Sequence, residues 1–262
     1  MARKEKVNNN AVVDTSRMFG SGLSFASREA YKLLRTNILF ALPDIEEDRA
    51  HIIGVTSSLR GEGKSTSAIN LAASLAEMNK KVLLLEADLR LPSVKLKLNV
   101  QPRPGVTNAL AEKTAPFIQA YPISKLNGAP VYIDVLVAGD IPPNPSELLG
   151  SSRMRQLLDW LSVRYDYIIM DLPPITAVTD ALVATKLVDG MILVVRNEHA
   201  DRNSLSEAIR QIHFVEGNLL GFVFTCANSS SGGYGKKYKY KYGSKYKYQS
   251  SYGYYGHHHE GR

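Results

Sequence analysis

The sequence predicts an α/β protein with a mostly parallel β-sheet flanked by helices, because short apolar runs alternate with amphipathic helical stretches. Most of the runs are apolar on successive residues, which is typical of strands covered on both faces. The predicted strands lie at residues 52–56, 82–85, 131–137, 167–170, 191–195 and 219–224. The predicted helices between them lie at residues 65–78, 151–162, 180–188 and 204–215.

The two ends of the chain differ in composition from this alternating part. Residues 1–23 are polar and rich in Gly, Ser and Asn, and we expect a flexible leader there. The folded domain is expected at residues 24–228, beginning with a helix from about Ser27 to near Pro43. Residues 229–262 are poor in aliphatic side chains, which predicts a disordered tail. For its triplet His257-His258-His259, a solvated end is favoured over a metal site or an added tag.

Composition and charge limit the classes of function. The 44% hydrophobic content of the 262 residues suits one core with flexible ends. The formal charge is +7, but residues 232–262 carry seven basic residues and one acidic residue, so +6 belongs to the tail. The nearly neutral remainder argues against a broad nucleic-acid-binding face on the fold. The single cysteine, Cys226, and the lack of a signal peptide or a membrane-spanning apolar run favour a cytoplasmic location.

Residues 57–66 read Ser-Ser-Leu-Arg-Gly-Glu-Gly-Lys-Ser-Thr and stand between a predicted strand and a predicted helix. A phosphate-binding loop needs inward backbone N–H groups, small residues, a lysine for the outer phosphates and a hydroxyl for Mg²⁺. This segment supplies all four, although Ser58 replaces the first glycine of the general pattern. A P-loop NTPase-like fold follows, with these predicted nucleotide-binding residues: Arg60, Gly61, Glu62, Gly63, Lys64, Ser65 and Thr66.

Carboxylates follow two of the predicted strands. Glu86 and Asp88 come after the strand at 82–85, and Asp171 comes directly after the strand at 167–170. Because the carboxyl ends of parallel strands meet at one edge of a sheet, these acids should gather beside the phosphate loop. Ser65, Asp88 and Asp171 are therefore the predicted Mg²⁺ ligands. A turn or a helix cap is the alternative role for either strand-end acid.

The tail concentrates the tyrosines of the chain. Nine of the 14 tyrosines lie between residues 234 and 255, among Lys, Gly and Ser. A packed core does not use tyrosine in this way, whereas isolated tyrosines in a flexible tail can enter another subunit's cleft without unfolding it. The predicted phosphate acceptors are Tyr234, Tyr238, Tyr240, Tyr242, Tyr246, Tyr248, Tyr252, Tyr254 and Tyr255.

These motifs, in this order, resemble those of bacterial tyrosine kinases of the capsular and exopolysaccharide type, in the single-domain cytoplasmic form of Gram-positive bacteria. The likeness extends from about Arg28 to the tail and includes the Pro/Asn-rich run at 142–149. It implies phosphorylation of tail tyrosines by ATP and Mg²⁺, in trans between subunits of a ring-shaped homo-oligomer. It also implies a membrane-spanning activator, or polysaccharide co-polymerase, that holds the kinase at the inner face of the membrane, and a cognate phosphotyrosine phosphatase.

The same resemblance assigns the oligomer interface to a Glu-x-x-Arg-x-x-Arg-like run, here Glu29, Lys32 and Arg35, with a solvated helix face as the alternative. The chain departs from the family pattern in three places. Glu86 replaces an aspartate, Lys32 replaces an arginine, and Arg60 replaces a proline. Lysine keeps the charge of arginine but lacks its planar fork. These departures bear on rate and on oligomer strength more than on the type of reaction.

For phosphoryl transfer, the predicted catalytic residues are Lys64, Glu86, Asp88 and Asp171, and either Glu86 or Asp88 would orient or deprotonate the phenol. One alternative is a partition or septum-placement ATPase of the ParA/MinD kind, which shares the scaffold and transfers no phosphate to protein. Such ATPases carry a signature lysine early in the loop, and none precedes Lys64 within residues 57–66. The other alternative is a binding module, in which the tail adheres to nucleic acid or anionic lipid.

Overall fold

The structure is a computed structural model that describes residues 22–45, 48–112, 114–126 and 128–227, and one compact unit of the chain ends at Thr225. The nine predicted acceptor tyrosines and the histidine triplet lie outside the described residues. The helices are α1 (Phe25–Ala41), α2 (Lys64–Ala76), α3 (Val94–Leu98), α4 (Val106–Glu112), α5 (Pro145–Leu149), α6 (Ser152–Ser162), α7 (Asp180–Thr185) and α8 (Arg202–Phe214). The strands are β1 (His51–Ser57), β2 (Val82–Glu86), β3 (Gln119–Leu126), β4 (Ala129–Leu136), β5 (Tyr167–Asp171), β6 (Gly190–Arg196) and β7 (Leu219–Thr225).

Within the described residues the strands form one seven-stranded sheet in the order β3-β4-β2-β5-β1-β6-β7. Every neighbouring pair is parallel except β3 with β4, which is antiparallel. The prediction of a mostly parallel sheet flanked by helices is therefore confirmed. The strand β5 lies between β1 and β2. A single strand therefore separates β1, which precedes the phosphate loop, from β2, which ends at Glu86.

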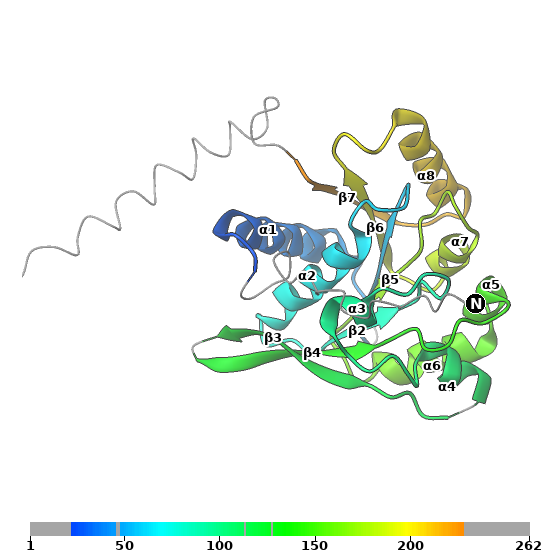
Figure 1. The fold of residues 1–262 in the computed structure, drawn as a ribbon. Helices are drawn as coiled ribbons and strands as arrows, with labels where there is room; N and C mark the ends of the chain where they lie inside the picture. The colour runs from blue at the N-terminus through cyan, green and yellow to red at the C-terminus, as the bar shows by residue number, and fades with distance from the viewer. Residues whose placement is uncertain (1–21, 46–47, 113, 127, 228–262) are drawn as a thin grey trace, which may run out of the picture. The chain divides into compact units, whose positions relative to one another are not determined.

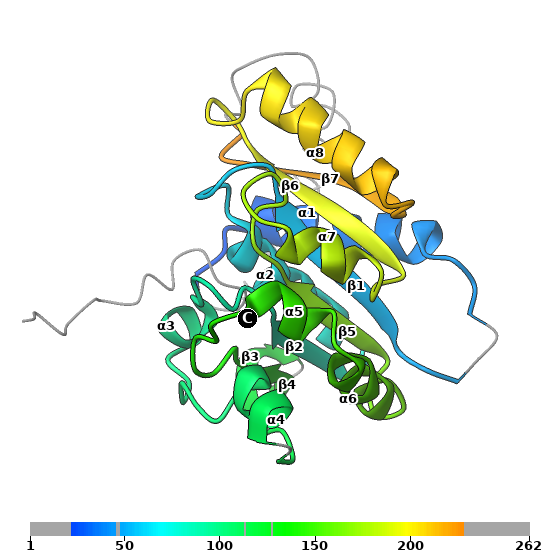
Figure 2. The same cartoon turned by 90° about the vertical axis from the view of Figure 1, so that its right-hand side faces the viewer.

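Helices cover both faces of the sheet and bury two apolar cores (Figure 1 and Figure 2). Side chains of α1, α2 and α3 pack on one face, and side chains of α4 to α8 pack on the other. In β5, Ile169 belongs to the core beneath α1, α2 and α3, while Ile168 and Met170 belong to the core beneath α4 to α8. This two-sided burial is the physical reason that the central strands are apolar on successive residues.

Local capping sets the ends of several helices. The α1 helix begins at Phe25, slightly before the predicted start at Ser27, because the side chain of Ser24 accepts a hydrogen bond from Ser27 N at 3.1 Å. It ends at Ala41, before Pro43, as the sequence predicts. Ser151 caps α6 and Asp201 caps α8 in the same way, by accepting from backbone N–H groups three residues further on.

Some elements are absent from the sequence prediction. The strand β3 was not predicted, because its burial alternates irregularly and Pro122 interrupts it next to a shift in register. The short helices α3, α4 and α5 were not predicted either. The edge strand β7 is covered incompletely, since Phe222 and Phe224 are 41% and 64% exposed. In the described part of the chain, no helix is both long and apolar enough to cross a membrane.

Candidate active site

The phosphate loop, residues 57–66, connects the end of β1 to the start of α2. Gly61 and Gly63 have φ values of +84° and +95°, which side chains with a Cβ rarely adopt, so glycine is required at both positions. Gly63 is also the N-cap residue of α2. The first turn of this helix therefore starts at Lys64, with its free backbone N–H groups and positive dipole end next to the loop.

The carboxylate of Glu62 holds the loop together from inside. It is fully buried and accepts hydrogen bonds from Ser58 Oγ at 2.9 Å and from Leu59 N at 2.6 Å through one oxygen. Its other oxygen accepts from Arg196 N at 3.3 Å, and Thr225 Oγ1 donates to the Glu62 carbonyl at 2.7 Å. Glu62 was predicted to bind nucleotide, and the structure places its side chain in the loop interior rather than on the pocket wall.

The register of the parallel strands brings the strand-end acids together. Glu86 of β2 is paired with Asp171 of β5, and Asp171 is in turn paired with Val55 of β1. Lys64 Nζ lies 2.7 Å from Asp88 Oδ2 and 3.6 Å from Asp171 Oδ1. Burial alone would lower the pKa of Lys64, but the charges of Asp171 and Asp88 outweigh burial and raise that pKa. Lys64 is therefore a fully charged ammonium at neutral pH.

Asp171 is a completely buried carboxylate, and neither of its oxygens accepts a hydrogen bond of good geometry among the described residues, although the Lys64 ammonium at 3.6 Å and the Ser65 hydroxyl lie close to it. Burial raises its pKa, and the nearby Lys64 charge opposes that rise. An unsatisfied buried acid beside Asp88 and the hydroxyl of Ser65 fits a divalent cation that would supply the missing contacts. The described residues contain no cluster of three or more His, Cys, Asp or Glu placed to hold a metal. Mg²⁺ in nucleotide sites usually needs only one or two carboxylates plus phosphate and water, so the two observations agree.

Glu86 occupies a different environment from Asp88. Its Oε1 accepts hydrogen bonds from Ser93 N at 2.5 Å and Val94 N at 2.7 Å, and its Oε2 accepts from Ala138 N at 3.1 Å. Burial raises the pKa of Glu86, while these backbone donors work in the opposite direction. Glu86 was predicted as a catalytic candidate, and in the structure it ties the start of α3 to the end of β4 and does not line the pocket.

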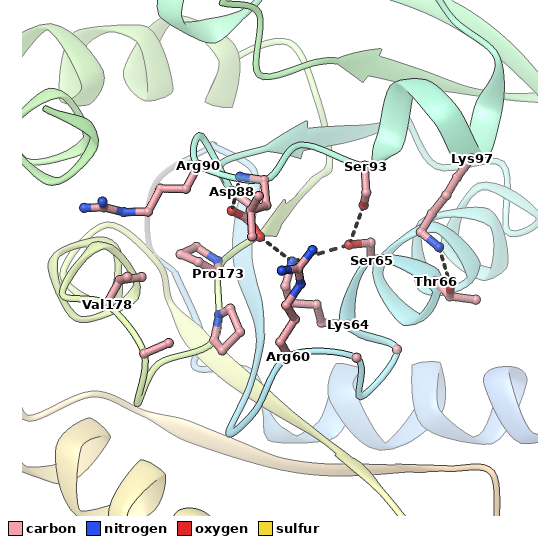
Figure 3. A pocket seen from close by; sticks show the side chains of 15 residues that line it. Arg60, Lys64, Ser65, Thr66, Asp88, Arg90, Ser93, Lys97, Pro173 and Val178 are labelled. Atoms are coloured by element: carbon pink, nitrogen blue, oxygen red, sulfur yellow. Dashed lines mark hydrogen bonds and ion pairs between the residues drawn. The ribbon is translucent and has the colours of Figure 1, made fainter. Parts of the chain in front are cut away.

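A pocket of about 410 Å³ opens beside the loop (Figure 3), within the size range of small-molecule sites. Of the predicted nucleotide-binding residues, all except Glu62 line it, and so does Asp88. The sequence analysis assigned no role to the other lining residues, which are Arg90, Leu91, Ser93, Lys97, Pro173, Pro174, Ala177 and Val178. They follow β2 and β5, so the rule that ligands bind beyond the carboxyl ends of parallel strands could have found them.

Arg90 is held at the rim of the pocket by a buried acid. Its Nε and Nη2 donate to the two carboxylate oxygens of Asp180 at 2.8 and 3.0 Å, and Ser146 Oγ donates to the same carboxylate. Asp180 is fully buried at the start of α7, and Ser146 belongs to α5, inside the run at 142–149. This contact joins the loop that carries Asp88 to the opposite wall of the pocket. In Figure 3 the Arg90 side chain points away from Lys64.

The predicted interface residues lie on α1, which packs beside α2 (Figure 1). Glu29 and Lys32 form an ion pair at 2.8 Å and remain 43% and 44% exposed. Arg35 instead donates to the backbone carbonyl of Ser74 in α2. Of the three residues, Glu29 and Lys32 thus form an exposed ion pair, whereas Arg35 contacts α2 of the same chain.

Comparison with known proteins points to one family. Residues 48–249 match the ParA family, described as a NUBPL iron-transfer P-loop NTPase. Tyrosine-protein kinase YwqD of Bacillus subtilis is 36% identical over 228 residues, which cover 87% of this chain and 86% of that protein. Tyrosine-protein kinase wzc of Salmonella typhi is 36% identical over 168 residues, or 64% of this chain, but the chain spans only 22% of that much longer relative.

A solved structure gives the same result. The kinase domain of Escherichia coli tyrosine kinase ETK superposes with a TM-score of 0.67 and 34% sequence identity, and the match covers 79% of this chain and 80% of that one. The fold and the phosphate loop, together with the strand-end acids, support nucleotide and magnesium binding in general. The chain therefore belongs to the bacterial tyrosine-protein kinases, which carry their chemistry on a ParA-type P-loop fold.

Proposed function

We propose that the chain transfers the γ-phosphoryl group of ATP to tyrosine, and that Lys64, Ser65, Asp88 and Asp171 carry the reaction. The observation that supports this most directly is the fully buried carboxylate of Asp171, which accepts no hydrogen bond of good geometry among the described residues and lies 3.6 Å from the Lys64 ammonium. Asp171 is not itself a lining residue of the pocket, but Lys64 is. Lys64 would bind the β- and γ-phosphates, and Ser65, Asp88 and Asp171 would hold Mg²⁺. When bound, Mg²⁺ neutralises charge that develops on the phosphate oxygens.

In this proposal the phenol oxygen forms a bond to the γ-phosphorus, and the bond between that phosphorus and the β,γ-bridging oxygen breaks, leaving ADP. The phenol proton passes to a carboxylate. Asp88 is the better candidate for orienting the phenol, because it lines the pocket whereas Glu86 is held by three backbone N–H groups. Phosphoryl transfer needs mainly positioning and charge neutralisation, which this set of residues provides.

We further propose that the acceptors are tail tyrosines of a neighbouring copy in a homo-oligomeric ring, and that Glu29 and Lys32 contribute to the contact between copies. Their exposed ion pair on α1 is available to a partner, whereas Arg35 would first have to leave the Ser74 carbonyl. A membrane-spanning activator of the polysaccharide co-polymerase type would hold the kinase at the cytoplasmic face of the membrane. Capsule or exopolysaccharide synthesis is the process that such an assembly would regulate, with a phosphotyrosine phosphatase reversing the modification.

The test is incubation with radiolabelled ATP and Mg²⁺, with and without the cytoplasmic segment of a candidate activator, followed by mass spectrometry of the tail. The K64M variant should abolish labelling, whereas K80M, which alters a lysine outside the pocket, should label normally. Equal labelling of K64M and wild type would refute the assigned site. Steady ATP hydrolysis with no phosphotyrosine in the presence of the activator would instead favour an ATPase switch of the ParA kind.

A further inference from the structure

Four cationic side chains line the pocket, and two of them are already neutralised by acids. Lys64 is paired with Asp88 and Asp171, and Arg90 is paired with Asp180. The other two, Arg60 and Lys97, form no ion pair with any carboxylate in the part of the chain that the structure describes. Arg60 belongs to the phosphate loop and was already predicted to bind nucleotide. Lys97 comes from a different element, and its positive charge in the pocket is unexplained.

The fold holds Lys97 in a defined place. It lies on the short helix α3, whose Val94 and Leu98 are fully buried in the core, so the helix cannot turn without exposing them. The Glu86 carboxylate binds the backbone N–H groups at the start of this helix. The other lysine of this helix, Lys95, does not line the pocket, so the helix presents only one of its two lysines to the site.

Lys97 Nζ donates to Thr66 Oγ1 at 3.3 Å, and Figure 3 shows the two side chains facing one another at one end of the pocket. In a phosphate loop the lysine reaches the β- and γ-phosphates and the following hydroxyl reaches Mg²⁺, so the next position, here Thr66, lies toward the α-phosphate. A lysine ammonium has three donors, so Lys97 can keep Thr66 and still donate to a phosphate oxygen.

We propose that Lys97 is a second phosphate-binding lysine that contacts the α-phosphate of the nucleotide. This inference depends on the proposed nucleotide binding and adds a residue from outside the phosphate loop. The α-phosphate is present in both ATP and ADP, and its bonds do not change during transfer to tyrosine. Lys97 therefore stabilises the bound nucleotide and the transition state equally, which lowers KM for ATP and leaves kcat unchanged.

The experiment compares K97M with K95M, which removes the neighbouring lysine of the same helix. Affinities for Mg-ATP, Mg-ADP, AMP and adenosine are measured by calorimetry, and kinase rates are measured with a separate tyrosine peptide. For K97M we expect about tenfold weaker binding of ATP, ADP and AMP, unchanged binding of adenosine, about tenfold higher KM for ATP and unchanged kcat. K95M should behave as wild type, and K97R, which keeps the charge, should recover most of the affinity. Equal thermal unfolding temperatures check that all variants are folded.

Each other outcome overturns the assignment. Weaker binding of ATP with normal binding of ADP and AMP would place Lys97 at the γ-phosphate. A higher KM for the tyrosine peptide with unchanged nucleotide affinity would place it in the acceptor site, and a K97M variant identical to wild type would leave it with no role in binding. If wild-type protein bound none of these nucleotides, the proposed function itself would fail, and this result differs from all of the others.

Discussion

At the scale of single residues, Asp171 shows how the site combines burial with charge. Its carboxylate is fully buried and unsatisfied among the described residues, which is costly for a structural acid but suitable for a metal ligand. Burial raises its pKa above the ordinary value for an aspartate. Because the folded state holds this proton more tightly than the unfolded state, the stability it contributes is present below the unfolded pKa and is lost as pH rises through the folded pKa.

The D171N variant keeps the shape of the side chain and removes its charge. Without nucleotide or metal, we expect the free energy of unfolding of wild type to fall relative to that of D171N between about pH 4 and about pH 7. Tyrosine phosphorylation should fall by roughly a hundredfold or more, because a proposed Mg²⁺ ligand is lost. Urea unfolding at both pH values and the initial rate of labelling check the two expectations. A stability difference that did not change with pH would contradict the raised pKa.

Glu86 tests a choice that the sequence left open. In E86Q one side-chain atom becomes an N–H donor, so either the Ala138 N–H or the N–H groups that start α3 lose their acceptor. We expect a loss of about 1–3 kcal/mol in the free energy of unfolding. We also expect a rise in KM for ATP that exceeds any change in kcat, because α3 carries Lys97 into the pocket. The matched variant D88N should instead lose kcat, and a large kcat loss in a stable E86Q protein would identify Glu86 as the base.

At the scale of elements, the contact of Arg90 with Asp180 and Ser146 joins three segments: the β2–α3 connection, α5 and α7. An asparagine at position 180 cannot accept from both arms of the guanidinium. Since Asp180 is fully buried but Arg90 is 43% exposed, we expect D180N to cost about 2 kcal/mol, less than a fully buried pair would. The Mg²⁺ concentration for half-maximal rate should rise, because the loop carrying Asp88 loses its tether.

Urea unfolding and a magnesium titration of the kinase rate measure these two effects. The control is E216Q, which removes one partner of an exposed ion pair with Lys186 and should change neither quantity. If D180N lost stability but kept the wild-type magnesium dependence, the contact would only hold the fold together and would not position Asp88.

The sequence predicts the central strands and long helices well, since β1, β2, β5 and β6 are buried on both faces and therefore read as continuous apolar runs. It does not predict β3, whose mixed burial and internal proline remove both usual strand signals. The phosphate loop and the strand-end acids can be found from the sequence alone, because each follows a predicted strand. The direction of each side chain cannot be found in this way. Glu62 is turned inward mainly by donors of its own loop, Ser58 Oγ and Leu59 N, and Glu86 is turned inward by backbone N–H groups that lie beyond β2.

At the scale of the whole molecule, charge links the proposed catalysis to assembly. The tail region at 232–262 carries a formal charge of +6 and nine tyrosines. Phosphate adds about −1.5 to −2 per tyrosine, so full modification would bring this region to roughly −8 to −12. We expect the resulting repulsion between neighbouring tails to lower the mass of the oligomer.

Light scattering before and after incubation with ATP and Mg²⁺ measures this change. A variant with all nine tail tyrosines replaced by phenylalanine serves as the control, since it keeps the length and the lysines of the tail and cannot be phosphorylated there. The mass of the oligomer should fall only for the wild-type protein. Identical oligomer masses for the two proteins after incubation with ATP and Mg²⁺ would show that tail charge does not govern assembly.

The contact between α1 and α2 has a mechanical consequence. Arg35 of α1 donates a hydrogen bond to the carbonyl of Ser74 in the last turn of α2, while Lys64 and Ser65 occupy the first turn of the same helix. At 1.5 Å per residue, the 13 residues of α2 form a rod about 20 Å long, and almost all of them are enclosed by neighbouring side chains. The Arg35 contact and the proposed phosphate-binding ammonium of Lys64 therefore lie near opposite ends of one buried helix, so a displacement of α1 that shifted α2 along its axis would also shift Lys64.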